Sequence, residues 1–200
     1  MSKARETREK ILKQAAELFN QRGYSGSSIS DIMRVTGLQK GGIYNHFKSK
    51  DELALEAFEF ASNCVSKRYM EALKGKRNAI ARLQAIITVF HSFVTDPPIG
   101  GGCPLLNTAI ESDDAHPALR EKTQQAMNSW RSLISRIIDK GITRGEIRPT
   151  VEADAIATIF ISTLEGAMMM SKLYGDSIHI NRAVAHLTEY IEQNLKQPNR

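Results

Sequence analysis

Cysteines, aromatic residues and long apolar runs are scarce in this sequence of 200 residues. The two cysteines, Cys64 and Cys103, are too few for a disulfide framework, and no Cys/His spacing is typical of a zinc site. No apolar run approaches the ~18 residues that span a bilayer, and the N-terminus is charged where a signal peptide is apolar. We therefore expect a protein of the reducing cytoplasm, with no membrane partner and no cofactor.

Signatures of catalysis are missing as well. The sequence has no nucleophile elbow, no phosphate-binding loop and no site of paired carboxylates, so we expect no catalytic residues. A few potential metal ligands do occur close together, but without regular ligand spacing: Glu111, Asp113, Asp114 and His116, with His91 further away. A helix linker and cap before Pro117 explain this segment better, and we expect no metal.

Positive charge is concentrated near the N-terminus. Residues 1–50 hold ten Lys and Arg against four Asp and Glu, whereas residues 51–200 hold seventeen against eighteen. A basic segment attached to a nearly neutral body is typical of a nucleic-acid-binding module joined to a second domain, although solvated basic N-termini are also common.

Helical periodicity extends over almost the whole chain, and no segment alternates as a strand would. We predict an all-α fold of about nine helices, with a head at 1–50, a connecting helix at about 50–73, and a ligand-sensing and dimerisation domain over 51–200. The expected helices cover roughly 6–21, 28–37, 39–47, 49–73, 78–95, 104–112, 117–141, 151–173 and 179–195.

The segment 28–47 predicts two short helices joined by a tight turn. Ser28 and Asp31 have capping-box spacing, and Gly37 is placed to end the first helix in the left-handed conformation. The second helix, Gln39 to Phe47, is too short to be stable alone and must dock on its neighbours. This pattern is a helix-turn-helix, whose second helix enters the major groove of DNA.

Several short motifs occur together between residues 18 and 53. They are Leu18-Phe19-x-x-x-Gly23-Tyr24, Ser30-Asp31-Ile32, Gly37, Lys40-Gly41, Ile43-Tyr44-x-His46-Phe47 and Ser49-Lys50-x-x-Leu53. Together they resemble the TetR family of bacterial transcriptional regulators. The resemblance covers about residues 7–60, with Met33 standing where a small residue is usual, and it implies a dimeric, ligand-responsive repressor. A weaker resemblance, in Gly102-Cys103-Pro104, is to a subset of that family with a Gly-Cys pair opening the sixth helix.

Candidate DNA contacts lie at the starts of three predicted helices and, for Tyr44 and His46, further along the second helix of the helix-turn-helix. Gln39 and Lys40 are suited to base edges, and Gly41 permits close approach of the backbone. Phosphate contacts are expected from hydroxyl, imidazole and ammonium groups, although Tyr44 could instead be core, and His46 and Lys50 solvated. The full predicted set is Ser27, Ser28, Gln39, Lys40, Gly41, Tyr44, His46 and Lys50.

The last two helices are candidates for a homodimer interface. An apolar stripe runs along the final helix, and the preceding helix is apolar almost all round. We expect a two-fold four-helix bundle, with packing inside a single chain as the alternative. The predicted interface residues are Ile180, Val184, Leu187 and Ile191.

The remaining helices are expected to hold a ligand cavity that controls the DNA-binding heads. Cys103 lies at a predicted helix start after three glycines, which favours a reactive thiolate; a small residue in a tight turn is the alternative. The other lining residues could equally be plain core. The predicted effector-pocket residues are Phe90, Phe93, Cys103, Met127, Trp130, Met168 and Lys172.

The sequence thus predicts a transcriptional regulator that binds a palindromic operator as a dimer and is released by a small molecule or an electrophile. An architectural helix-turn-helix protein without an effector is the competing hypothesis. Repression is favoured over activation only by the family resemblance, and the sequence identifies neither the effector nor the operator.

Overall fold

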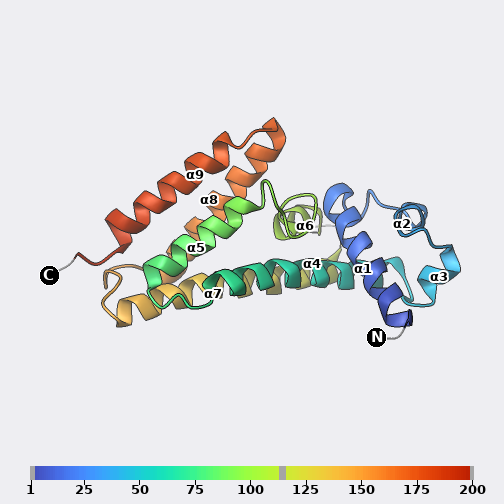
Figure 1. Cartoon of the computed structure of the whole chain (residues 1–200), viewed down its shortest axis with the longest axis horizontal. Coiled ribbons are helices and arrows are strands. Elements are labelled where there is room, and N and C mark those ends of the chain that lie inside the picture. Colours follow the sequence, from blue (N-terminus) through green and yellow to red (C-terminus); the bar gives the residue numbers. More distant parts are fainter. Residues whose placement is uncertain (1–2, 113–115, 199–200) are drawn as a thin grey trace. The chain divides into compact units, whose positions relative to one another are not determined.

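The computed structural model describes residues 3–112 and 116–198, in which helices are the regular structure and a single isolated bridge joins Ile147 to Lys196. The predicted all-α fold is confirmed (Figure 1). In chain order the helices are α1 (Lys3–Arg22), α2 (Ile29–Thr36), α3 (Lys40–Tyr44), α4 (Lys50–Leu73), α5 (Ala79–Ser92), α6 (Pro104–Ser112), α7 (Pro117–Thr143), α8 (Ala153–Tyr174) and α9 (Ile178–Tyr190), followed by a π-helical turn, Ile191–Leu195.

Most helix boundaries agree with the sequence prediction, but α1 begins at Lys3, before the predicted residue 6, and α3 ends at Tyr44, before the predicted Phe47. The ends of two further helices also differ. α5 ends at Ser92, before the predicted end at residue 95. α7 continues through Gly141, where we expected it to stop, and ends at Thr143, shortly before Gly145 with its φ of +70°. Gly141 is therefore a helical residue whose small size serves packing.

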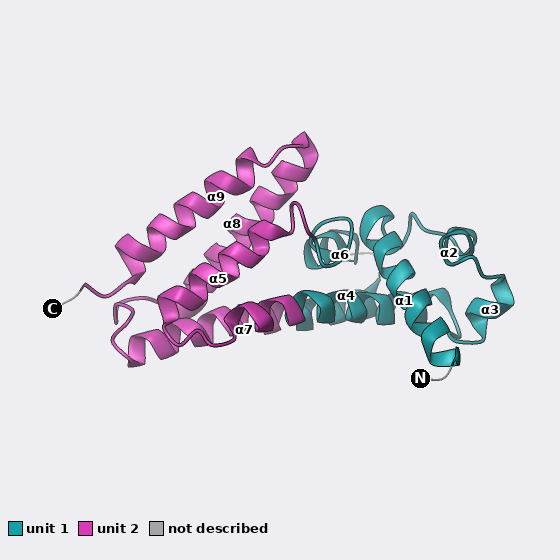
Figure 2. Cartoon of the chain, viewed as in Figure 1, with its two compact units in different colours: residues 1–66, 97–126 teal, residues 67–96, 127–200 magenta. Residues whose placement is uncertain are grey.

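Two compact units make up the chain (Figure 2). The first comprises residues 1–66 and 97–126, and the second residues 67–96 and 127–200. Helices α4 and α7 contribute residues to both units. The predicted head at 1–50 lies in the first unit, together with α6 and the beginnings of α4 and α7.

The first unit is built around the apolar face of α1. Ile11 and Ala15 of this helix are fully buried, and so are Ile32 of α2 and Leu53 of α4. The short α3 is held by Ile43, which is 1% exposed. As expected for a five-residue helix, docking on neighbours rather than intrinsic propensity maintains it.

The predicted capping box of α2 is present and fixes where that helix begins. The Ser28 hydroxyl accepts a hydrogen bond from the Asp31 N–H at 3.1 Å, and the Asp31 carboxylate accepts one from the Ser28 N–H at 3.0 Å. Gly37 ends the helix with a φ of +70° and donates its N–H to the Met33 carbonyl. Both signals together define the first half of the helix-turn-helix.

In the second unit, α9 packs on α8 and α5. The core includes fully buried Ile86, Phe160, Leu164 and Ile180. By length and composition alone α8 would pass as a membrane span, but half of its most apolar window is buried inside the protein. That burial is typical of the core helix of a folded domain.

Candidate nucleic-acid interface

Helix α3 buries one side and exposes the other. Ile43 points into the core of the first unit, whereas Lys40 and Gly41 are exposed and Tyr44 is 39% exposed. Gln39 precedes the helix as its N-cap residue and is exposed too. The structure therefore gathers four of the predicted DNA contacts on one short, rigidly docked helix.

The side chains on this exposed surface suit DNA chemistry. Apart from the adjoining residues and the backbone of α3 itself, no atom of the described residues lies within 4 Å of where a Cβ on Gly41 would be, so the backbone is open to a close partner. The Lys40 ammonium lies 5.8 Å from the centroid of the Tyr44 ring. The exposed side of α3 thus presents the Gln39 amide, the Lys40 ammonium, the Tyr44 phenol and the open backbone at Gly41.

Ser27 and Ser28 differ, although we predicted both as phosphate contacts. Ser27 is 1% exposed, and its hydroxyl donates to the Gly23 carbonyl at 2.7 Å. Its N–H is directed to the Tyr24 carbonyl at 3.3 Å. The expectation for Ser27 is therefore corrected: both of its donors hold the turn before α2, whereas Ser28 is exposed.

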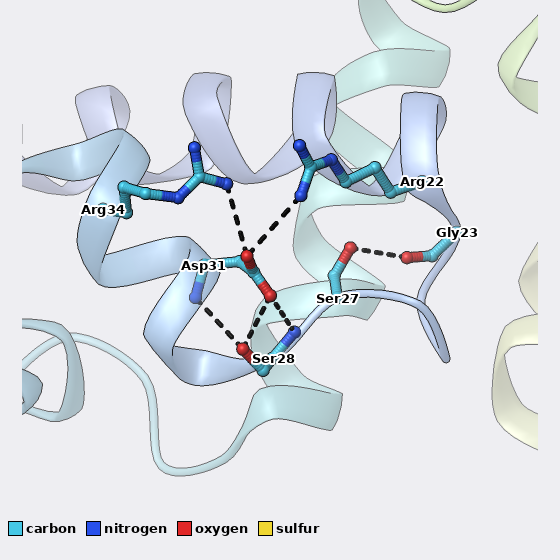
Figure 3. A network of polar contacts seen from close by, with 6 residues as sticks. All are labelled: Arg22, Gly23, Ser27, Ser28, Asp31 and Arg34. Carbon is cyan, nitrogen blue, oxygen red and sulfur yellow. Dashed lines mark hydrogen bonds and ion pairs between the residues drawn. The ribbon is translucent and has the colours of Figure 1, made fainter.

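Asp31 is the centre of a small ionic network (Figure 3). Its carboxylate lies 3.6 Å from the Arg22 guanidinium of α1 and 3.3 Å from that of Arg34. Hydrogen bonds from Ser28, first from the side chain and then from the backbone, lower the pKa of Asp31 to about 2, with a further contribution from Arg34. Arg34 lies three residues after Asp31 on the same helix, whereas the contact from Arg22 of α1 could not be predicted from spacing.

Lys50 is anchored beside the helix-turn-helix. Its ammonium donates to the Tyr24 carbonyl at 2.7 Å and lies 4.0 Å from the centroid of the Tyr24 ring. The Tyr24 hydroxyl donates to Asp51, and burial, followed by that hydrogen bond, raises the pKa of Tyr24 to about 12. The Lys50 ammonium is thus held close to the start of α2. The remaining predicted phosphate contact, His46, is half-buried.

Helix α6 is hydrogen-bonded to the end of α1 in two places. The Glu111 carboxylate accepts the backbone N–H groups of Tyr24 and Ser25 at 2.7 and 2.6 Å. The Asn107 amide donates to the side-chain and backbone oxygens of Asn20, at 2.8 and 3.0 Å. Sequence inspection missed both contacts because their partners are 86 to 87 residues apart.

The predicted effector-pocket residues do not form one group. In the second unit, Phe90 stacks on Trp130 with 5.6 Å between ring centroids, and Phe93 and Tyr69 complete an aromatic cluster. Met168 is buried and Met127 half-buried in the same unit, whereas Lys172 is exposed.

Cys103 belongs to the first unit and is 2% exposed. Cys64 is half-buried on the periphery of the first unit's core. Cys103 is therefore the less accessible of the two thiols, which favours the alternative of a small residue in a tight turn over a reactive thiolate. Three glycines before Cys103 suggested an open turn, but they bring the chain against α1, where Asn20 binds the Gly100 and Gly102 carbonyls.

The predicted dimer residues are also corrected. Ile180, Leu187 and Ile191 are at most 1% exposed within the single chain, and Val184 is half-buried. Helices α5 and α8 of the same chain cover the stripe, which was the alternative to dimerisation. An amphipathic pattern shows that a stripe is buried, but not by which partner.

A capped α2, a tight turn at Gly37 and a docked α3 with a polar exposed surface define a helix-turn-helix DNA-binding protein. Comparisons with known proteins agree. Residues 11–57 match the family of bacterial regulatory proteins of the tetR type, and residues 79–187 match the tetracyclin repressor-like C-terminal domain. The chain belongs to the TetR family, and it is a DNA-binding transcriptional regulator rather than an enzyme.

Solved structures and curated relatives support this membership over the whole length. A TetR transcriptional regulator from Chloroflexus aurantiacus is 46% identical, covers 99% of this chain and all of its own, and has a TM-score of 0.96. A TetR-family regulator from Cytophaga hutchinsonii is 32% identical, covers 100% and 99%, and has a TM-score of 0.89. The transcriptional repressor DhaR from Mycobacterium sp. (strain GP1) is 25% identical over 83% of this chain and 82% of its own.

Proposed function

We propose that this protein is a cytoplasmic repressor that binds a palindromic operator as a homodimer and leaves it when a small molecule binds. The observation that carries the proposal is the exposed N-terminus of α3 on a helix whose other side is locked into the core. Such a helix enters the major groove without rearranging. Similarity to the repressor DhaR supports repression.

Contacts to bases and contacts to phosphates come from different positions. We assign base reading to Gln39 and Lys40, which extend from the first turn of α3, with close approach at Gly41. Tyr44, His46, Ser28 and Lys50 are assigned to phosphates. Ser27 is left out of this assignment because its hydroxyl and N–H are both used inside the turn.

A second copy of this chain is the partner that fits the outward side of α8. That side carries several exposed apolar side chains, with exposed Ser162 and open space at Gly166 between them. A stripe of this kind on a soluble protein is typical of an interface, and small residues allow a second helix to approach closely. The exposed residues are Ile159, Met169, Met170, Leu173 and Tyr174 of α8, with Ile178 at the start of α9.

A two-fold dimer of this kind predicts an operator of matching symmetry. Two copies of α3 related by a two-fold axis reach half-sites about one helical turn, ~34–36 Å, apart. Dimerisation also doubles the number of phosphate contacts and therefore steepens the salt dependence of binding.

The aromatic cluster of the second unit is the proposed effector site. Trp130 is 8% exposed, and its indole N–H has no hydrogen-bond partner among the described residues. A buried donor without an acceptor is costly, so a bound molecule that offers an acceptor would be stabilised there. We therefore propose a mainly apolar, reversibly bound effector with one acceptor near Trp130, and we assign Cys103 a structural role because of its burial.

The proposal is tested by selecting DNA from a random pool with the purified full-length protein. The expected result is a palindrome whose half-sites are one helical turn apart. Recovery of a single, non-repeated site would contradict the dimer, and recovery of no consensus would contradict sequence-specific binding. Operator binding that no co-purified or added molecule weakens would favour an architectural protein without an effector.

A further inference from the structure

The second unit contains a basic groove that the proposed function does not use. It has a volume of about 580 Å³ and lies between the beginning of α5 and the C-terminal half of α7. Glu146 is its one acidic lining residue. The basic residues that line it are Lys76, Arg77, Arg82, Arg136, Lys140 and Arg144.

The net charge of the second unit resides in this groove. Outside the groove the unit holds nine basic and nine acidic residues, so the rest of it is neutral. A uniformly solvated surface would distribute its charges evenly. Six cations converging on one hollow instead create a local positive potential, which raises the local concentration of anions.

Acidic side chains do not neutralise the groove. Across the described ranges, none of the six basic side chains forms an ion pair. The Glu146 carboxylate is directed at the start of α5, where it accepts the Ala79 N–H at 2.6 Å. The Glu146 carboxylate thus binds the N-terminus of α5 and does not pair with the basic side chains of the groove.

Backbone contacts hold three guanidinium groups in place, and one of them is that of Arg136, which donates to the Ser132 carbonyl at 3.0 Å. The Arg82 guanidinium donates to the Lys76 carbonyl at 3.1 Å, and that of Arg144 donates to the Arg77 carbonyl at 3.0 Å. Each of these bonds uses one of the five N–H donors of its arginine. The remaining donors are therefore pre-positioned, which lowers the entropy lost when a ligand binds.

Close packing between α5 and α7 shapes the floor of the groove. A Cβ on Gly141 would come within 2.7 Å of the Ala79 Cβ and of the Ile147 side chain. Any larger residue would push the beginning of α5 away from α7. This packing explains a glycine in mid-helix, where it costs about 1 kcal/mol relative to alanine.

We propose that the groove binds a small anion with several phosphate groups, of the class of nucleoside triphosphates or short inorganic polyphosphates. Its volume lies within the usual range for small-molecule sites. Arginine donors form paired hydrogen bonds with phosphate oxygens, and several cations are needed to match several negative charges. This site is separate from both the DNA-binding helix and the aromatic cluster.

Calorimetric titration of the full-length protein with inorganic tripolyphosphate, and separately with ATP, tests the proposal. The variant is Lys76→Glu with Lys140→Glu, because neither lysine makes a described side-chain hydrogen bond. The matched control is Lys67→Glu with Lys74→Glu, which makes the same charge change at exposed positions of the same unit outside the groove. The groove variant should weaken binding by more than about tenfold, and the control should bind like the parent.

The two probes also distinguish the sources of the phosphate. Equal affinity for both identifies a site for the phosphate chain alone, whereas tighter ATP binding adds a nucleoside contact; either supports the proposal. No binding of either probe, or equal weakening by both variants, would overturn it. A groove variant that binds tripolyphosphate like the parent but loses affinity for random duplex DNA would overturn it in favour of a second DNA-contacting surface. Operator selection with the parent is a separate readout, so failure here leaves the proposed function intact.

Discussion

The Glu111 carboxylate on α6 holds the backbone of Tyr24 in the turn after α1, with an N–O distance of 2.7 Å. The Ser25 N–H donates a second hydrogen bond at 2.6 Å, so the carboxylate accepts two backbone N–H groups of the turn that leads into α2. The capping residue of α2, Ser28, follows only three residues later. A shift of α6 therefore acts on the helix-turn-helix through directional hydrogen bonds as well as through packing.

Replacing Glu111 with alanine should loosen this turn. Hydrogen bonds to charged groups contribute about 1.5–3 kcal/mol each, so we expect the loss of both bonds to lower the free energy of unfolding by about 3–6 kcal/mol. Operator affinity should fall as well, because α2 loses its fixed start. Urea denaturation measures the first effect, with Glu121→Ala, an exposed acid of α7, as the control. Equal stability of the two variants would show that the carboxylate does not hold the turn.

Asp31 should give the protein a distinct acid sensitivity. Its pKa of about 2 in the folded state lies below the ordinary value of 3.8, so its carboxylate stabilises the fold above about pH 4. That contribution should disappear as the pH falls from about 4 to about 2. In Asp31→Asn, the decrease in unfolding free energy over this range should be smaller than in the parent. Identical pH profiles would contradict the network.

The proposed dimer interface on α8 predicts different outcomes for two pairs of substitutions. Met169→Glu with Leu173→Glu places charge on side chains that are 48% and 75% exposed in the single chain, so the variant should fold as a monomer. Val184→Glu with Leu187→Glu should instead unfold the protein, because Leu187 is core. Sedimentation and circular dichroism distinguish these outcomes. The control is Met70→Glu with Ile110→Glu. Both side chains are 63% exposed and lie outside α8 and α9, so this variant should remain dimeric.

The two thiols should differ in reactivity. Because Cys103 is 2% exposed and Cys64 is half-buried, a thiol-directed electrophile should label Cys64 first in the native protein. Mass spectrometry of peptides after timed labelling measures the order. Faster labelling of Cys103 would contradict its structural role and restore an electrophile as a candidate effector.

Local signals in the sequence predicted local structure well. The Ser28–Asp31 capping box, the end of α2 at Gly37 and the range of α6 were all correct because each depends on residues close together in the chain. Family motifs concentrated in residues 7–60 then indicated the helix-turn-helix and its function.

Features that depend on long-range contacts were missed or misassigned. The α9 stripe was correctly identified as buried, but its partner proved to be the same chain. Ser27 has the composition of a phosphate contact, yet its hydroxyl turns inward to Gly23. The basic groove escaped notice because its residues are spread from Lys76 to Glu146, a stretch in which nine basic and seven acidic residues nearly balance. Periodicity and spacing give no information about which distant segments meet.

Fluorescence anisotropy tests the central claim most directly. It compares binding to the selected operator with binding to a random duplex, for the parent and for the double variant Gln39→Ala with Lys40→Ala. We predict that the double variant loses most of the preference for operator, about 1–3 kcal/mol for each lost bidentate contact, while its affinity for random DNA changes far less. Lys50→Ala should instead weaken binding to both duplexes and reduce the salt dependence by about one phosphate contact. A Gln39/Lys40 variant that retains the full preference of the parent would contradict the assignment of α3 as the recognition helix.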